Sequence, residues 1–392
     1  MSRELQIEGR EGSIASNHFI KMNIVSNKFR FWWLAVFSVC FVSAQAADLP
    51  AELKPYLQPP AEFAGKLGNY RSPLKFYDGS QVKTAADWPK RRAELLAKWQ
   101  EVMGPWPKVL EKPLLEIQSS TNRDGYIQHK VKVQYGAYQF QEGYLLIPEG
   151  KGKFPAVLVP FYDPETSVGL AGKPLRDFAW QLAKRGFVTL AIGSPGGSAY
   201  EPDTAGAACQ PLSYHAYVSA NCANALANRP EVDARRIGVM GHSYGGKWAM
   251  FSACLNEKFA CAVWSDPGIA FDEKRTSVNY WEPWYLGKEK GVTRKRGLPT
   301  PENPRTGAYK VMVEQGMDLP EFQTLMAPRP FFVSGGSEDF PARWVALNSV
   351  CTVYELLGLE NRVGMSNRPK HDPTEESNEL IYRFFEHFLK GE

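Results

Sequence analysis

The chain of 392 residues is poor in cysteine, has little net charge and lacks a long apolar run. Its formal charge is only +4, so the composition gives no indication of a nucleic-acid partner. The one pronounced apolar run, residues 31–42, is too short to cross a bilayer comfortably, so we expect no stable membrane insertion. No internal repeat or low-complexity segment is present, which excludes a repeat array. With 44% hydrophobic residues, the chain can instead build a sizeable core.

The first 46 residues are typical of an export signal. Lys21, Lys28 and Arg30 precede the apolar run, and residues 44–46 read Ala-Gln-Ala, an A-x-A cleavage site. We therefore expect residues 1–46 to be a signal peptide with an upstream extension, and the mature protein to be secreted or periplasmic.

Five of the six cysteines remain after this signal, and an odd number leaves at least one thiol unpaired. An oxidising compartment permits disulfides, and the candidate pairs are Cys209 with Cys222 and Cys254 with Cys261. No C-x-x-C or His/Cys cluster has metal-site spacing, so we expect neither a metal nor a cofactor.

The mature chain divides into an N-terminal arm and helix, residues 47–110, and a catalytic domain, residues 111–392. The arm is proline-rich and irregular. Asp87 then indicates the start of a helix over Trp88–Met103, which Gly104 ends.

The catalytic domain begins with alternating segments and continues with buried ones. Alternation predicts antiparallel strands at 114–119, 127–135 and 139–147. Short apolar strands then alternate with helical segments; the strands are expected at 156–160, 187–192, 236–240, 261–264 and 330–333, and the helices at 175–185, 212–228, 246–255, 345–357 and 374–389. This alternation predicts an α/β fold whose mostly parallel central sheet has helices on both faces. One insertion, at about residues 268–307, interrupts the pattern.

The sequence Gly-His-Ser-Tyr-Gly at residues 241–245 lies between one of these strands and the next helix. Strand, turn and helix around G-x-S-x-G make the nucleophile-elbow pattern. The glycines are needed because the strand and helix backbones nearly touch there. The turn also directs the first helical N–H groups toward the hydroxyl, where they can stabilise an oxyanion. We therefore expect Ser243 to be a nucleophile.

A serine nucleophile needs a base and a carboxylate that orients the base. His371 is our choice of base, because it lies in a turn-forming loop just before the last expected helix. The carboxylate should follow a late strand, and Asp339 is our first choice. Glu338 is the second candidate, and Asp266, after the preceding strand, is the third.

The oxyanion hole needs two N–H donors. One should be the N–H of Tyr244, directly after the nucleophile, and the other that of Tyr162 or Phe161, after the first parallel strand. Lys247 lies one turn into the elbow helix, where it either faces the substrate pocket or is a solvated lysine.

These motifs resemble those of secreted α/β-hydrolases. The segment 229–246, with His371 and Asp339, is similar to acetyl xylan esterase-like and dienelactone hydrolase-like enzymes. Residues 241–247 also resemble the glucuronoyl esterase pattern G-C-S-R-x-G-K, except that Tyr244 replaces the arginine implicated in oxyanion stabilisation. The resemblance implies a serine esterase that acts on a carbohydrate.

The insertion supports such a substrate. It carries Trp281 and Trp284, flanked by two tyrosines and followed by a basic run. Flat aromatic faces pack against sugar rings, and basic side chains favour an acidic glycan. Alternatively, the aromatic residues form the insertion's own core.

Three functions follow from these residues. The first is an esterase on acetylated xylan or a related plant polysaccharide, or on a uronate ester. The second is a peptidase of the prolyl oligopeptidase type, for which the chain is short. The third is a non-catalytic carbohydrate-binding protein with a hydrolase fold.

Overall fold

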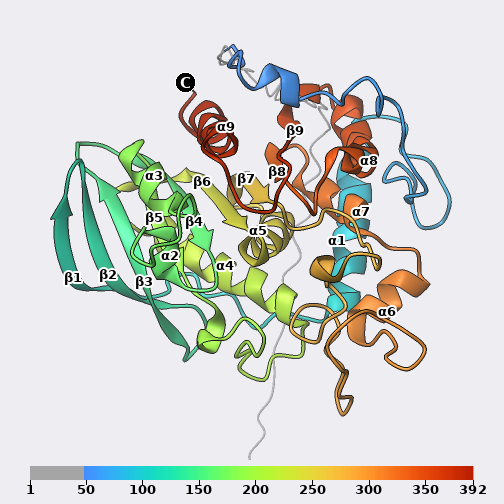
Figure 1. Cartoon of the computed structure of the whole chain (residues 1–392), viewed down its shortest axis with the longest axis horizontal. Helices are drawn as coiled ribbons and strands as arrows, with labels where there is room; N and C mark the ends of the chain where they lie inside the picture. The colour runs from blue at the N-terminus through green and yellow to red at the C-terminus, as the bar shows by residue number, and fades with distance from the viewer. Residues whose placement is uncertain (1–47, 392) are drawn as a thin grey trace, which may run out of the picture. The chain divides into compact units, whose positions relative to one another are not determined.

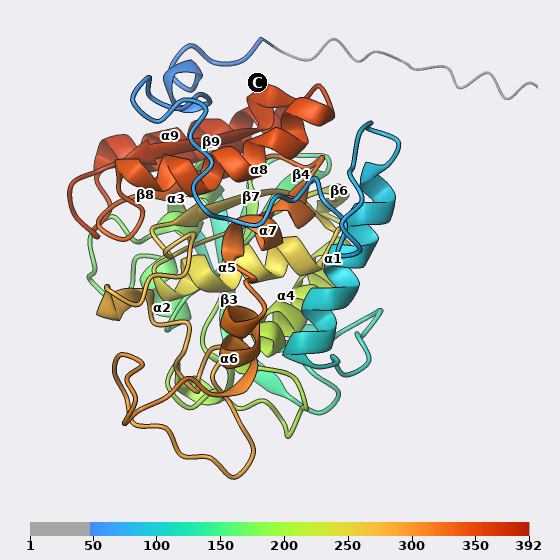
Figure 2. The same cartoon turned by 90° about the vertical axis from the view of Figure 1, so that its right-hand side faces the viewer.

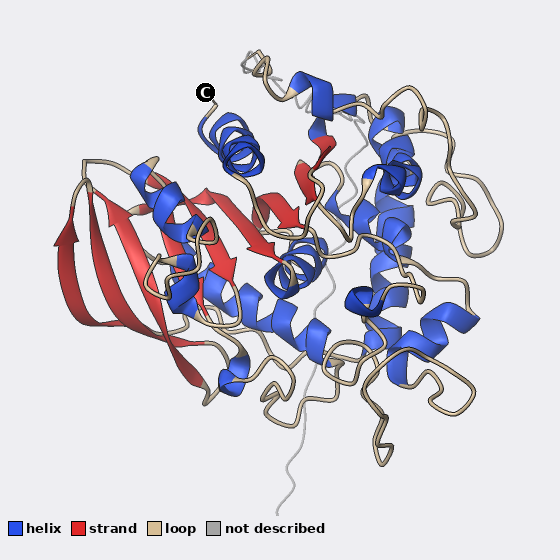
Figure 3. Ribbon diagram, viewed as in Figure 1, coloured by secondary structure: helices blue, strands red, loops and turns tan. Residues whose placement is uncertain are grey.

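The computed structural model describes residues 48–391, and the expected signal peptide lies outside these residues. Nine strands form one sheet in the order β1-β2-β3-β5-β4-β6-β7-β8-β9. Their bounds are β1 Leu115–Arg123, β2 Tyr126–Gln134, β3 Phe140–Pro148, β4 Phe154–Pro160, β5 Val188–Ile192, β6 Val232–His242, β7 Phe259–Ser265, β8 Phe331–Gly335 and β9 Val363–Asn367. Strands β1, β2 and β3 are antiparallel, β3 joins β5 antiparallel, and all strands from β5 to β9 run parallel, as Figure 3 shows in red.

Helices cover both faces of this sheet (Figure 1). Their bounds are α1 Trp88–Met103, α2 Pro164–Ser167, α3 Phe178–Lys184, α4 Pro211–Ala227, α5 Tyr244–Leu255, α6 Gly307–Glu314, α7 Leu319–Gln323, α8 Trp344–Leu356 and α9 Glu375–Phe385. One core lies between the sheet and α1, α4, α5 and α8, and a second lies between the sheet and α3 and α9. Both faces are therefore buried, which explains why strands β4, β5, β7 and β8 are mostly apolar and buried along nearly their whole length.

The expected strands and helices are found in the described residues, with shifted ends, but one strand was missed. Strand β9 reads Val-Gly-Met-Ser-Asn, which is short and mixes a glycine with polar residues. Its neighbour β8 pairs with all five of its residues, so tertiary pairing rather than local propensity makes it a strand. Neither candidate disulfide is formed, because Cys209, Cys222, Cys254 and Cys261 are all free thiols.

The N-terminal arm, residues 48–77, runs over α8 and α9 and then reaches α1, as Figure 2 shows in blue. The Asn348 side chain in α8 donates to the carbonyls of Phe63 and Lys66, at 2.7 and 2.9 Å. The buried Arg91 of α1 donates to the carbonyl of Pro73 at 3.1 Å. The arm and α1 thus belong to the same compact unit as the sheet. No helix within residues 48–391 is long and apolar enough to span a membrane.

Asn221 joins α4 to the chain before β1 and to the β2–β3 hairpin. Its side chain accepts from the N–H of Leu110 and donates to the carbonyl of Tyr135, both at 2.8 Å. Asn221→Ala should lower the free energy of unfolding by about 2–4 kcal/mol, because two backbone groups lose their partner. Asn228→Ala, at the exposed end of the same helix, should cost less than about 1 kcal/mol. Urea unfolding of both variants measures the difference, and equal losses would contradict the assignment.

Candidate active site

Ser243 occupies a strained turn between β6 and α5. Its φ of 57° and ψ of −116° lie where residues with side chains are rarely found. A Cβ on Gly241 would lie 2.2 Å from the Gly245 carbonyl oxygen, and one on Gly245 would lie 2.3 Å from that of Pro160. Glycine is therefore required at both positions. The Ser243 N–H donates to the carbonyl of Ser265 at 2.8 Å, which ties the turn to the end of β7.

His371 and Asp266 meet beside this turn. Nδ1 of His371 lies 2.6 Å from Oδ2 of Asp266, which directly follows β7 and is fully buried. The other carboxylate oxygen accepts three backbone N–H groups, from Gly336 at 2.7 Å, Asp339 at 2.8 Å and Glu338 at 3.1 Å. Since Oδ2 accepts the Nδ1 proton, Nε2 of His371 keeps its lone pair and can act as a base.

This geometry corrects our first choice of carboxylate. The Asp339 oxygens accept the N–H groups of Gly268, at 2.9 Å, and Ile269, at 2.6 Å, while His371 contacts Asp266. Burial, together with the nearby Asp266 charge, raises the pKa of Asp339 to about 7. Glu338, the second candidate, pairs with Arg275 at 3.3 Å. All three carboxylates follow a strand in the sequence. The direction in which each side chain points decides which of them contacts His371.

Two further residues hold His371, and the sequence analysis missed both. The ring of His242 packs against that of His371 with centroids 4.7 Å apart. Burial, with His371 and Arg368 nearby, holds the pKa of His242 well below its usual range, so its ring is neutral. Arg368 donates to the carbonyls of His371, at 2.7 Å, and Ser334, at 2.7 Å, and so fastens the loop to the end of β8.

The expected oxyanion donors lie on either side of Ser243. Tyr244 begins α5, so its N–H has no partner inside the helix. The Phe161 N–H donates to Ile192 at 3.0 Å, which leaves Tyr162 as the second expected donor. Tyr162 also brings a hydroxyl near Ser243, and burial raises the pKa of this phenol to about 12. The phenol is therefore protonated at neutral pH and is available as a donor beside the nucleophile.

The side chain of Tyr244, at the sequence position of the arginine in the glucuronoyl esterase pattern, points into the interior of the protein. Its hydroxyl lies 2.6 Å from Nε2 of His215, in the interior. Nδ1 of His215 contacts the carbonyl of Pro211, and burial lowers the pKa of this histidine to about 4. Nε2 therefore accepts from the Tyr244 hydroxyl, which directs this ring away from the oxyanion position.

Lys247 was expected either to face the substrate pocket or to be solvated, and the structure places it elsewhere. It is 3% exposed, and its ammonium group donates to the carbonyl of Pro267 and lies 4.7 Å from the centre of the Tyr280 ring. Burial lowers its pKa to about 8. The lysine thus joins α5 to the loop that follows Asp266, instead of facing solvent or an open pocket.

The aromatic insertion divides into a core and a rim. Trp281 is 1% exposed and packs against Tyr309 with ring centroids 6.0 Å apart, so it is a core residue. Trp284 is half-buried and lies 5.3 Å from Tyr200, which is 50% exposed. The guanidinium of Arg296 lies 5.0 Å from the Tyr200 ring and 5.5 Å from that of Trp284. Trp281 therefore belongs to the insertion's own core, whereas Trp284 lies at the surface, and its contact with a sugar stays a prediction.

Among residues 48–391, no group of three or more His, Cys, Asp or Glu side chains is arranged to hold a metal ion.

Known proteins resemble this chain in sequence and in structure. Residues 177–299 match the model of the prolyl oligopeptidase family. A carbohydrate esterase from an unknown prokaryotic organism is 22% identical over 190 residues, which are 41% of this chain and 40% of that protein. The chain thus matches only two fifths of the length of that curated relative.

Solved structures match over more of the chain. A glucuronoyl esterase from Solibacter usitatus has a TM-score of 0.64 and 21% identity over 82% of this chain and 98% of that one. A glucuronoyl esterase from Caldicellulosiruptor kristjansonii has a TM-score of 0.57 and 20% identity over 84% of this chain and 93% of that one. A structure described as a putative acetyl xylan esterase from Bacteroides fragilis has a TM-score of 0.53 and 18% identity over 75% of this chain and 79% of that one. These matches confirm the resemblance that the motifs indicated, and the chain has the α/β-hydrolase fold.

Proposed function

We propose that the protein is a serine esterase that hydrolyses a carboxylic ester on a carbohydrate through an acyl-enzyme. The observation that carries this proposal is the strained Ser243 turn beside the His371–Asp266 hydrogen bond of 2.6 Å. A nucleophile, a base and a carboxylate that orients the base are the parts that acyl transfer requires.

The reaction follows from these parts. His371 Nε2 accepts the Ser243 proton while Oγ attacks the ester carbonyl, and Asp266 stabilises the imidazolium that forms. The N–H groups of Tyr244 and Tyr162 and the Tyr162 phenol donate to the oxyanion. The C–O bond to the alcohol then breaks, and His371 returns its proton to the leaving oxygen. Water, deprotonated by the same imidazole, attacks the acyl-enzyme and releases the acid.

The carbohydrate part of the proposal has two supports. The curated relative and the solved neighbours carry the names of carbohydrate esterases, glucuronoyl esterases among them. The rim of Tyr200, Trp284 and Arg296 offers aromatic faces and a cation at the surface. Acetylated xylan, a related plant polysaccharide and a uronate ester fit these features. The prolyl oligopeptidase match favours a peptidase as the second candidate, and a panel of ester and peptide substrates separates the two.

Ser243→Ala should lower kcat on 4-nitrophenyl acetate by roughly 10⁴- to 10⁶-fold, because the nucleophile is lost. His371→Ala should lower kcat by a similar factor. The double variant should have a kcat little lower than either single variant, since the two residues act as a unit. Ser252→Ala, on the same helix, is the control and should keep full activity. A wild-type protein that neither hydrolyses esters nor reacts with a fluorophosphonate probe would instead be a binding protein.

Asp266→Asn should lower kcat by roughly 10⁴-fold, because the amide no longer holds His371 in the reactive tautomer. Asp339→Asn should lower kcat less than Asp266→Asn does, since Asp339 does not contact His371 and acts only through the loop at residues 268–269 that it holds. Steady-state kinetics of both variants decide between them. The reverse order of effects would return the role to Asp339.

Trp284→Ala should lower kcat/KM on an oligosaccharide ester by about tenfold while sparing 4-nitrophenyl acetate, because a sugar ring loses its aromatic contact. Trp281→Ala should instead lower the free energy of unfolding by about 3–5 kcal/mol. Kinetics on both esters and a thermal melt distinguish the two residues. Equal losses on both esters for Trp284→Ala would remove the rim from the binding site.

A further inference from the structure

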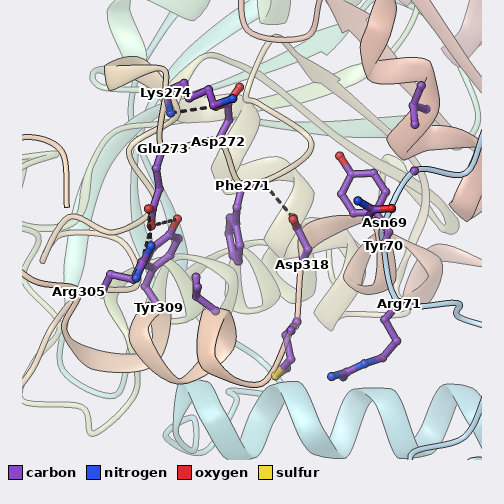
Figure 4. A pocket seen from close by; sticks show the side chains of 15 residues that line it. Asn69, Tyr70, Arg71, Phe271, Asp272, Glu273, Lys274, Arg305, Tyr309 and Asp318 are labelled. Atoms are coloured by element: carbon purple, nitrogen blue, oxygen red, sulfur yellow. Dashed lines mark hydrogen bonds and ion pairs between the residues drawn. The ribbon is translucent and has the colours of Figure 1, made fainter. Parts of the chain in front are cut away.

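A hollow of about 640 Å³ lies apart from Ser243, His371 and Asp266, none of which lines it. Figure 4 shows its lining residues. Its size is that of ordinary small-molecule sites. Three segments that are distant in sequence meet around it: the end of the arm, at residues 68–71, the insertion, at 271–274 and Arg305, and the chain from α6 to α7, at 309–318.

The arm wall is held firmly in place. Arg71 pairs with Glu321 at 3.5 Å and donates to the carbonyl of Gln315, between α6 and α7. The Asn348 bonds to the arm fix the segment that precedes this wall. The hollow is therefore formed before any ligand arrives, which lowers the entropic cost of binding.

Most charges around the hollow are already paired. Glu273 contacts Arg305 through both of its oxygens, at 2.5 and 2.6 Å, and accepts the Tyr309 hydroxyl at 3.1 Å. Asp272 pairs with Arg343 at 2.6 Å. The lining contains three basic and three acidic side chains, so it has no excess of either sign. An uncharged ligand suits such a lining better than an ion does.

Asp318 is the acidic side chain of the lining for which the structure shows no ion pair within residues 48–391. One of its oxygens, Oδ1, accepts the N–H groups of both Phe271, at 2.8 Å, and Leu319, at 2.6 Å. The lone pairs of Oδ2 are thus not needed for these bonds. Burial raises the pKa of this carboxyl to about 7. A hollow that combines apolar walls, a few polar groups and a carboxyl with a shifted pKa has the features of a binding site.

The walls suit a sugar. Tyr70 and Phe271, which are both partly exposed, supply aromatic surface, and Figure 4 shows Asp318 between them. Tyr309 is buried behind this surface. Aromatic faces pack against the apolar side of a pyranose, while carboxyl and amide groups take its hydroxyl groups.

The hollow is also near enough to serve the same substrate. Phe271 follows Asp266 by five residues, and a fully extended chain of that length spans at most about 18 Å. The Cα atom of Phe271, in the wall of the hollow, is therefore at most about 18 Å from that of Asp266 in the catalytic site.

We propose that this hollow is a glycan subsite, in which Asp318, Asn69 and the aromatic walls hold an uncharged sugar unit of the substrate away from the ester. The proposal rests on the proposed function for the identity of the ligand, but binding and hydrolysis can be measured separately.

The test is calorimetry of the Ser243→Ala protein with three probes: xylotetraose, cellotetraose and a xylo-oligosaccharide with a glucuronic acid branch. At least one should bind, and Asp318→Asn should weaken it by about tenfold or more, because Oδ2 becomes an amide donor. Asparagine keeps the oxygen that accepts from Phe271 and Leu319. Asn69→Ala, at an exposed side chain, is a second variant that leaves the packing unchanged and should also weaken binding.

Glu314→Gln is the matched control, since it removes an exposed carboxylate from α6 outside the hollow, and it should bind as tightly as the parent. No binding of any probe at millimolar concentration would overturn the subsite, as would binding that both hollow variants leave unchanged. Hydrolysis of esters without such binding removes only the subsite, and binding in the hollow without ester hydrolysis by the wild type removes only the proposed function.

Discussion

The site depends on one reciprocal contact between two loops. Asp266, after β7, accepts three N–H groups from residues 336–339, and Asp339, after β8, accepts two from residues 268–269. Each carboxylate thus satisfies backbone donors of the other loop, which would be costly to bury unpaired. This exchange fixes Oδ2 of Asp266 at His371, and it explains why two buried acids stand side by side although only one touches the imidazole.

The remaining contacts of the site continue this arrangement outward. Lys247 fastens α5 to Pro267, directly after Asp266, and Arg368 fastens the His371 loop to β8. The ammonium group of Lys247 lies over the buried Tyr280 ring of the insertion. The buried aromatic rings thus form a core that anchors the insertion. An insertion without regular strands can hold Trp284 and Arg296 at a defined place only because it buries Trp281 and its neighbours.

The N-terminal arm is another irregular segment that specific contacts hold in a defined place. It contributes little regular structure, yet its polar contacts with α8, with α7 and with the chain between α6 and α7 make it one wall of the hollow that Asp318 lines. An irregular, proline-rich arm thus becomes part of the binding surface that we propose.

The sequence by itself determined the parts that depend on local pattern. Alternating strands and helices predicted the α/β fold, and the glycines around Ser243 predicted its turn, because a close backbone approach leaves no room for a Cβ. Position in a loop before the last helix was enough to choose His371. Only the tertiary structure decided between Asp339 and Asp266, made a strand of β9 and separated Trp281 from Trp284. The two acids, like the two tryptophans, share the same local signal, and β9 has only a weak one. The direction of a side chain and the presence of a pairing neighbour are set by segments far away in the sequence.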